Sequence, residues 1–266
     1  MHYTGPVYRP PFEAKSLMLE IAAGCNHNSC AFCTMYRDVP FSVSPLEQVE
    51  ADLREAAKRL PYTTRVFLEN GDPFVLSTDK LLKIAELIHK HLPRVETIAM
   101  YASVNNIKSK KQKELELLRA AGINELNIGV ESGLDEALLR LNKGYTADEA
   151  VREFLRLKEA GMDYGANIIL GAGGSGQYLE NARETAGLLN AVQPYLIFTG
   201  TIHADPGCPL YDDLASGRFT ENTTEQYFAE EETLLELLTV QDCLYLGFIH
   251  PILCRCRGSS RPTKKG

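Results

Sequence analysis

The chain has 266 residues, 44% of them hydrophobic, which is enough to bury a full core. Its net charge of −7 excludes a general attraction to phosphate backbones and disfavours nucleic acid as a partner. No apolar run reaches the ~20 residues of a membrane helix, and the first residues lack the pattern of a secretory signal. We therefore expect a cytoplasmic protein with no membrane partner, whose seven cysteines serve as metal ligands and free thiols rather than as a disulfide framework.

Apolar β-type runs alternate with segments of helical period, which is the pattern of βα units around a parallel sheet. Six units are too few for the eight-fold barrel. The predicted fold is therefore α/β, a partial (β/α)6 TIM-like barrel whose functional groups collect at the C-terminal ends of the strands. The six strands are predicted at Leu17–Ala22, Arg65–Leu68, Thr97–Tyr101, Glu125–Gly129, Tyr164–Leu170 and Tyr195–Gly200.

Caps and stop residues predict the helices. Ser44 is predicted as the N-cap of the first helix, with Pro45 at its first position and Glu47 completing a capping box. A lead-in over residues 1–15, a core domain over 16–203 and a short helical C-terminal extension over 204–266 form the expected organisation. The other helices are predicted at Thr78–His91, Lys110–Ala121, Thr146–Ala160, Tyr178–Ala191 and Thr224–Leu238.

Three cysteines, Cys25, Cys30 and Cys33, share one loop directly after the first predicted strand. Three thiolates can hold three irons of a cubane cluster and leave the fourth iron open to an external ligand. A closed structural zinc site takes four ligands, so a zinc knuckle completed by His27 or by a remote cysteine is one alternative. Three unliganded thiols are another. Because three thiolates complete the protein's share of a cubane site, we interpret His27 as a polar loop residue.

With Phe32 just before the last cysteine, this loop resembles the signature of the radical S-adenosylmethionine (radical SAM) superfamily. Four residues separate the first two cysteines, where most members have three. The resemblance implies a 4Fe-4S cluster held by Cys25, Cys30 and Cys33, with S-adenosylmethionine as the second cofactor and Phe32 beside it.

Motifs after later strands extend the resemblance over about residues 16–216, in a branch like the elongator, methylthiotransferase and nitrogenase-maturation core. Segment 69–73 is similar to the family's Gly-Gly-Glu motif for the cofactor's amino group, and segment 127–133 to its Gly-Val-Gln/Glu-Ser motif. Lys143 stands where the branch has an arginine for the cofactor carboxylate, although a lysine cannot make the bidentate fork. The residues that the resemblance assigns to the cofactor here are Asn70, Gly71, Asp72, Ser103, Glu131, Lys143, Leu170 and Gly171.

Several polar and aromatic residues near predicted strand ends are candidates for the substrate side, with packing at the barrel rim as the alternative. Cys208, in a Pro-Gly-Cys-Pro element, is interpreted as a structural thiol because reactive cysteines need a special setting. The substrate-side candidates are Met35, Tyr36, Tyr101, Ser103, Asn105 and His203.

The resemblance implies reductive cleavage of S-adenosylmethionine to a 5′-deoxyadenosyl radical that acts on an unidentified small-molecule or peptide substrate. The electron would come from a reductase, a flavodoxin or a ferredoxin. Two alternatives stay open: a tRNA- or protein-modifying member of the superfamily, and a non-catalytic iron-sulfur or zinc module. The sequence names neither the reaction nor the fate of the cofactor.

The tail from about residue 246 has no periodicity and a sudden basic bias. Relatives in the resembled family often end in a His-x-Ser-Asn segment followed by Pro-Leu-x-Gly and Leu-Pro-x-Asp-Lys. A shift of one nucleotide in a permitted back-translation gives such an ending. We therefore hypothesise a frameshift, which resequencing of the gene would test. The alternatives are a second metal site at Cys254 and Cys256, or a basic electrostatic tail.

Overall fold

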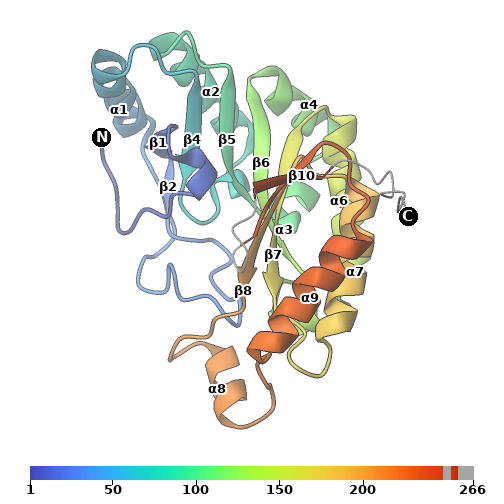
Figure 1. The fold of residues 1–266 in the computed structure, drawn as a ribbon. Helices are drawn as coiled ribbons and strands as arrows, with labels where there is room; N and C mark the ends of the chain where they lie inside the picture. Colours follow the sequence, from blue (N-terminus) through green and yellow to red (C-terminus); the bar gives the residue numbers. More distant parts are fainter. Residues whose placement is uncertain (248–252, 257–266) are drawn as a thin grey trace.

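The computed structural model describes residues 1–247 and, for the backbone alone, 253–256. Seven parallel strands of the described chain form one curved sheet, and a last strand joins it antiparallel (Figure 1). Their order is that of the chain: β1 (Leu17–Glu20), β4 (Arg65–Glu69), β5 (Thr97–Ala102), β6 (Ile123–Glu131), β7 (Asp163–Leu170), β8 (Leu196–Thr201), β9 (Cys243–Leu246) and β10 (Leu253–Cys256).

The six predicted strands and the open, partial barrel are confirmed. Beyond residue 203 the chain adds the two strands β9 and β10 to the predicted helix. The first predicted strand stops after Glu20, and β2 (Ala22–Ala23) pairs instead with β3 (Ser42–Val43) in a separate ribbon. This break lets the chain leave the sheet just before the cysteine loop.

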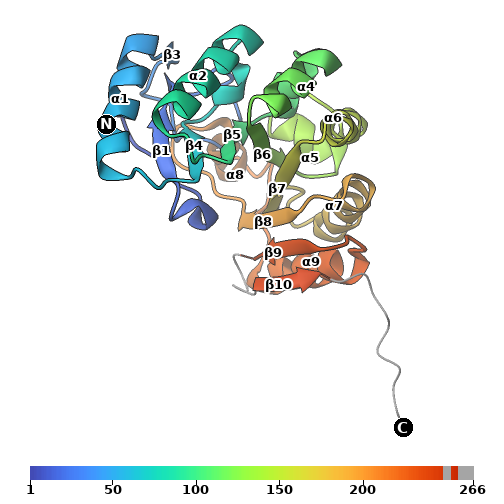
Figure 2. The same cartoon turned by 90° about the horizontal axis from the view of Figure 1, so that it is seen from above.

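The longer helices lie along the outer side of the curved sheet (Figure 2). Short helices at the strand ends, among them α3, α5 and α8, were not predicted. The α-helices are α1 (Leu46–Arg59), α2 (Thr78–His91), α3 (Val104–Lys108), α4 (Gln112–Ala120), α5 (Asp135–Arg140), α6 (Ala147–Glu159), α7 (Tyr178–Val192), α8 (Pro209–Ala215) and α9 (Thr224–Leu237), with 3-10 turns η1 (Pro11–Glu13) and η2 (Pro73–Val75).

The predicted cap of the first helix is wrong. Helix α1 begins at Leu46, its N-cap is the extended residue Pro45, and no side chain caps it. Ser44 is instead the residue that continues the β2–β3 ribbon, since its backbone N–H donates to the carbonyl of Ile21 at 3.0 Å. Helix α6 does begin in a capping box, in which Thr146 and Glu149 bond each other's backbone N–H groups.

The largest cluster of buried apolar side chains joins residues of the sheet with residues of helices α1, α2, α4, α6, α7 and α9. The inner side of the sheet has a small apolar layer around Met18, Phe67 and Ala99. At the N-terminal end of the strands, Arg65 pairs with Glu13 of the lead-in and with Glu125 of β6. The lead-in is thereby fixed to the base of the barrel.

In the described part of the chain, no helix is long and apolar enough to cross a membrane. The frameshift hypothesis concerns a tail that lies mostly outside the described residues. The side chains of Cys254 and Cys256 are likewise outside the described set.

Candidate active site

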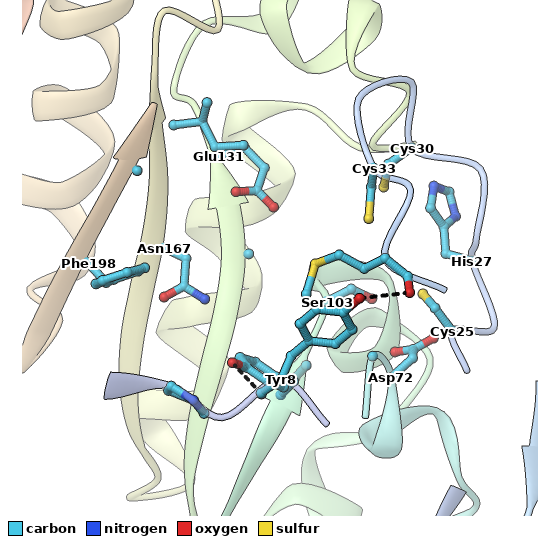
Figure 3. Close-up of a pocket in the computed structure, with 18 of the residues that line it drawn as sticks. Tyr8, Cys25, His27, Cys30, Cys33, Asp72, Ser103, Glu131, Asn167 and Phe198 are labelled. Atoms are coloured by element: carbon cyan, nitrogen blue, oxygen red, sulfur yellow. Dashed lines mark hydrogen bonds between the residues drawn. The ribbon is translucent and has the colours of Figure 1, made fainter. Parts of the chain in front are cut away.

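A pocket of about 650 Å³ opens at the C-terminal ends of the parallel strands. The cysteine loop forms one wall, strands β5 to β8 form the opposite wall, and the lead-in crosses between them. Figure 3 shows Cys25, Cys30 and Cys33 on the loop side, with Glu131, Asn167 and Phe198 facing them across the cavity. The predicted clustering of chemistry at this end of the barrel is therefore present.

Backbone hydrogen bonds hold the cysteine loop against three neighbouring segments. Gly71 N–H donates to the carbonyl of Gly24 at 3.1 Å, and Ala31 N–H donates to that of Leu141 at 3.0 Å. Leu210 N–H, in the first turn of α8, donates to the carbonyl of Ala31 at 2.9 Å. The loop therefore rests on the end of β4, on α5 and on α8.

The three loop cysteines are partly buried free thiols that line the pocket. Burial raises the pKa of the Cys30 thiol to about 11, and it also raises the pKa values of Cys25 and Cys33. At neutral pH the free thiols are thus protonated. Ligation of a metal by them must release protons.

The spacing of these thiols distinguishes two kinds of metal site. Among the described residues, no three or more His, Cys, Asp and Glu side chains converge so that they could hold a metal ion. A mononuclear zinc site needs such convergence, because every ligand must reach one ion at about 2.0 to 2.3 Å. In a cubane cluster each thiolate ligates a different iron, so the sulfurs stand apart. Three thiols suit a cubane cluster whose fourth iron stays open, and they fall one ligand short of a closed zinc site.

A buried ion pair lies across the pocket from the thiols. The register of β6 on β7 shifts between Gly129 and Glu131, so that Val130 is skipped. Glu131 has a positive φ of 69°, and its side chain lies in the cavity paired with Lys143. Tyr145 donates its hydroxyl to the carbonyls of Gly129 and Val130, which fixes the bulge. Burial opposes the charge on Lys143, but the Glu131 carboxylate and other neighbouring groups together outweigh it, and the pKa of Lys143 is raised.

The loop after β4 supplies a third polar group. Gly71 packs so closely on Tyr36 and Cys25 that a Cβ added to it would lie 2.6 Å from Tyr36 Cε2 and 2.9 Å from Cys25 Cβ. The next residue, Asp72, is buried, and burial raises the pKa of its carboxyl to about 7. Glycine at position 71 therefore brings a carboxyl and a backbone amide to the cysteine loop.

Nine of the twelve residues predicted for the metal and cofactor line the pocket. Three do not. Asn70 donates to Glu20 at 3.3 Å, Leu170 is buried, and Gly171 N–H donates to Glu230 at 2.9 Å beside the ring of Tyr227. The nine lining residues are Cys25, Phe32, Cys30, Cys33, Gly71, Asp72, Ser103, Glu131 and Lys143.

Among the substrate-side candidates, all but His203 line the pocket. The side chain of His203 is 81% exposed and pairs with Asp205. His27 lines the pocket, with Nε2 2.9 Å from the carbonyl oxygen of Asn142. Cys208 is fully buried and packs in an apolar cluster that includes Phe32. These positions agree with interpreting Cys208 as a structural thiol.

Two groups of lining residues were not predicted from the sequence. Residues 7–12 of the lead-in line the pocket, and Tyr8 stands in it with its hydroxyl 3.2 Å from the carbonyl oxygen of Met35. Asn167 and Phe198 project from the middle of β7 and β8. A polar residue inside an apolar strand run was a usable signal for Asn167, whereas the lead-in offered only its paired prolines.

Comparison with known proteins gives a family for this site. Residues 19–189 match the model of the radical SAM superfamily. The heme chaperone HemW of Bacillus subtilis (strain 168) is 24% identical over 168 residues, which are 62% of this chain and 44% of that protein. The 4′-phospho-dehydrooxetanocin synthase of Priestia megaterium is 26% identical over 173 residues, 59% of this chain and 23% of that one. The chain thus spans less than half the length of these two relatives.

Solved structures show the same fold at low sequence identity. Coproporphyrinogen III oxidase (HemN) of Escherichia coli superposes with a TM-score of 0.62 at 16% identity, covering 84% of this chain and 52% of that one. Methylornithine synthase (PylB) superposes with a TM-score of 0.60 at 17% identity, covering 86% and 63%. The partial barrel is therefore shared with enzymes of different reactions, and fold alone does not fix the reaction.

Proposed function

The chain belongs to the radical SAM superfamily, and on this basis we propose that it is an enzyme that cleaves S-adenosylmethionine reductively at a 4Fe-4S cluster. One observation supports the proposal most: three free thiols, a buried ion pair and a buried carboxyl all line one pocket. When bound, the reduced cluster supplies the electron that splits the cofactor into methionine and a 5′-deoxyadenosyl radical.

Different residues of this chain bind the cluster and S-adenosylmethionine. Cys25, Cys30 and Cys33 hold the cluster. The backbone of Gly71 and the carboxylate of Asp72 receive the amino group of S-adenosylmethionine, since a carboxylate and an ammonium form a charge-assisted hydrogen bond. Lys143 and Glu131 receive its carboxylate and its ribose or methionyl part.

Other lining residues shape the cavity and exclude water from it. Phe32 and Ser103 line the cavity on the cofactor's side, and Tyr8, Tyr36 and Tyr101 add aromatic rings to its lining. A dry cavity strengthens electrostatic interactions and protects a reactive radical from side reactions. The protein thus contributes position, electrostatics and exclusion of water, while the cofactors supply the difficult chemistry.

The radical acts on an unidentified small molecule or peptide, which shares the pocket of about 650 Å³ with the cluster and S-adenosylmethionine. A cytoplasmic reductase, flavodoxin or ferredoxin supplies the electron. A tRNA- or protein-modifying reaction is the alternative within the superfamily. The low-identity match to a heme chaperone favours a second candidate function, a carrier that binds the cofactors without turnover.

One experiment separates enzyme from carrier. The protein is reconstituted anaerobically with iron and sulfide, reduced with dithionite and incubated with S-adenosylmethionine, and 5′-deoxyadenosine is measured by liquid chromatography. Formation of 5′-deoxyadenosine only in the cluster-loaded, reduced sample supports the enzyme. A loaded cluster that yields none supports the carrier and contradicts our proposal.

A further inference from the structure

The wall of the pocket opposite the cysteine loop carries the Phe198 ring and the Asn167 amide, and the Phe12 ring of the lead-in packs beside them. Gly129, Asn167 and Phe198 are register partners across β6, β7 and β8, so their positions form a row on the inner face of the sheet. The ring of Phe198 meets that of Phe12 edge to face, with centroids 6.1 Å apart. A Cβ added to Gly200, which also lines the pocket, would meet no atom within 4 Å. The row therefore borders open space flanked by flat apolar rings.

The charged groups that line this pocket are already engaged. Lys143 is paired with Glu131. The Arg9 guanidinium donates through Nη1 to the carbonyls of Glu13, Ala14 and Ser16 at 2.9 to 3.1 Å, which closes the turn η1. Among the described lining residues, no lysine or arginine is left without such partners. With Lys143 assigned to the carboxylate of S-adenosylmethionine and Nη1 of Arg9 occupied by three carbonyls, an anionic substrate would lose its hydration for little charge compensation.

The Asn167 amide is the polar group of this wall. It points into the cavity beside Phe198 (Figure 3), and none of the described residues hydrogen-bonds its side chain. One layer deeper, Asn127 is fully buried, and neither its Nδ2 nor its Oδ1 has a partner in the described structure. Asn127 does not line the pocket, so the half-buried Asn167 side chain, which does, is the amide that an external polar group reaches.

We propose that the substrate half of the pocket binds an uncharged, planar apolar molecule with one amide-like edge, whose donor and acceptor bond the Asn167 side chain. The inference rests on the proposed function, because it assumes that the cysteine side is filled by the cluster and S-adenosylmethionine. Phe12 and Phe198 hold the ring, since aromatic rings favour edge-to-face and offset contacts. Asn167 is thus the residue that determines the preference of the pocket for uncharged over charged substrates.

Two nearly isosteric probes test this assignment. Indole-3-acetamide is neutral with an amide edge, and indole-3-acetate is its anionic counterpart. The chain contains no tryptophan, so indole fluorescence measures the free probe after equilibrium dialysis against cluster-loaded protein with S-adenosylmethionine. We expect the acetamide to bind at least about 10-fold more tightly than the acetate.

Variants of Asn167 make the test specific. Asn167→Leu removes both hydrogen-bonding groups and is expected to weaken acetamide binding about 10-fold. Asn167→Lys adds a free cation and is expected to reverse the preference in favour of the acetate. Asn167→Asp, close to the wild type in shape, is expected to weaken acetate binding further. The exposed Tyr62→Ala is the control that leaves both affinities unchanged.

Three outcomes overturn the inference: tighter binding of the acetate by the wild type, binding of neither probe at millimolar concentration, or an unchanged preference in Asn167→Lys. If the wild type prefers the acetate and Arg9→Gln loses that preference, then Arg9 acts as a free cation in the pocket and the inference is wrong. If the wild type forms 5′-deoxyadenosine but fails these tests, only this inference falls. If it forms none, the proposed function falls, whatever the probes do.

Discussion

Lys143 and Glu131 form an ion pair in the wall of the pocket, with Lys143 Nζ 2.8 Å from Glu131 Oε1 and both residues buried. The two residues come from different segments, one from a bulge at the end of β6 and one from the turn after α5. A buried pair of this kind tolerates the loss of one partner poorly, because the remaining charge stays without compensation.

We expect Lys143→Met and Glu131→Gln each to lower the free energy of unfolding by about 3 to 5 kcal/mol. The double variant should lose much less than the sum, since it leaves no unpaired charge. Urea denaturation of the four proteins measures this coupling. Additive losses would show that the two side chains act independently.

The glycine after Asn70 is expected to be essential for the cysteine loop. In Gly71→Ala the new methyl group would lie within 3 Å of Tyr36 and of Cys25 Cβ, so the loop must shift. We expect a loss of stability of about 1 to 3 kcal/mol and less iron after reconstitution. Gly187→Ala, on the exposed face of α7 with no atom near its Cβ, is the matched control and should stabilise the protein by about 0.5 to 1 kcal/mol.

The lead-in is held to the barrel by Arg65, which bridges Glu13 and Glu125. Arg65→Met leaves the fully buried Glu13 without its cationic partner, with only the Ser16 hydroxyl still donating to it, and we expect a loss of about 3 kcal/mol together with faster proteolysis near residues 7–12. Arg59→Met removes an exposed ion pair with Glu55 and should cost less than about 1 kcal/mol. Equal effects of the two changes would refute a special role for the bridge.

Glu69 predicts a pH dependence of stability. Burial, and then the neighbouring Glu20 carboxylate, raise the pKa of Glu69 from 4.5 to about 7, and neither carboxylate oxygen has a partner among the described residues. The folded state therefore holds this proton more tightly than the unfolded chain does. The resulting stabilisation is complete below pH 4.5 and is lost as the pH rises towards 7.

Glu69→Gln removes this titration, so the stability of the wild type should fall relative to the variant between pH 5 and pH 7, by at most about 3 kcal/mol. Thermal melts of both proteins across this range give the relative slope. Parallel curves would show that Glu69 is ionised throughout. Glu69→Gln also buries an amide, which changes the stability of the variant by the same amount at every pH and so leaves the relative slope unchanged.

The sequence predicted the strands and the cysteine loop well because both leave local signals. Apolar runs mark buried parallel strands, and three thiols on one loop after a strand mark a cofactor site at the barrel mouth. The Gly-Asp pair at 71 and 72 also lines the pocket as predicted. These features depend on residues that are close in the chain.

What the sequence missed depends on contacts between distant segments. Gly171 was assigned to the cofactor by its motif, but its N–H donates to Glu230, a residue of α9 far along the chain. The lead-in offered no periodic pattern, yet the Arg65 bridge brings it to the barrel. Ser44 looked like a cap, although its backbone continues a strand pairing. Such pairings become visible only once the chain is folded.

The central claim is that Cys25, Cys30 and Cys33 together hold the cluster on which cofactor cleavage depends. The most direct test reconstitutes the wild type, the three single Cys→Ala variants and the buried control Cys208→Ala, and measures iron, sulfide and 5′-deoxyadenosine for each. We predict about four irons per chain and product in the wild type and in Cys208→Ala, and loss of product in each loop variant. Full activity in any loop variant, or loss of the cluster only in Cys208→Ala, would contradict the account.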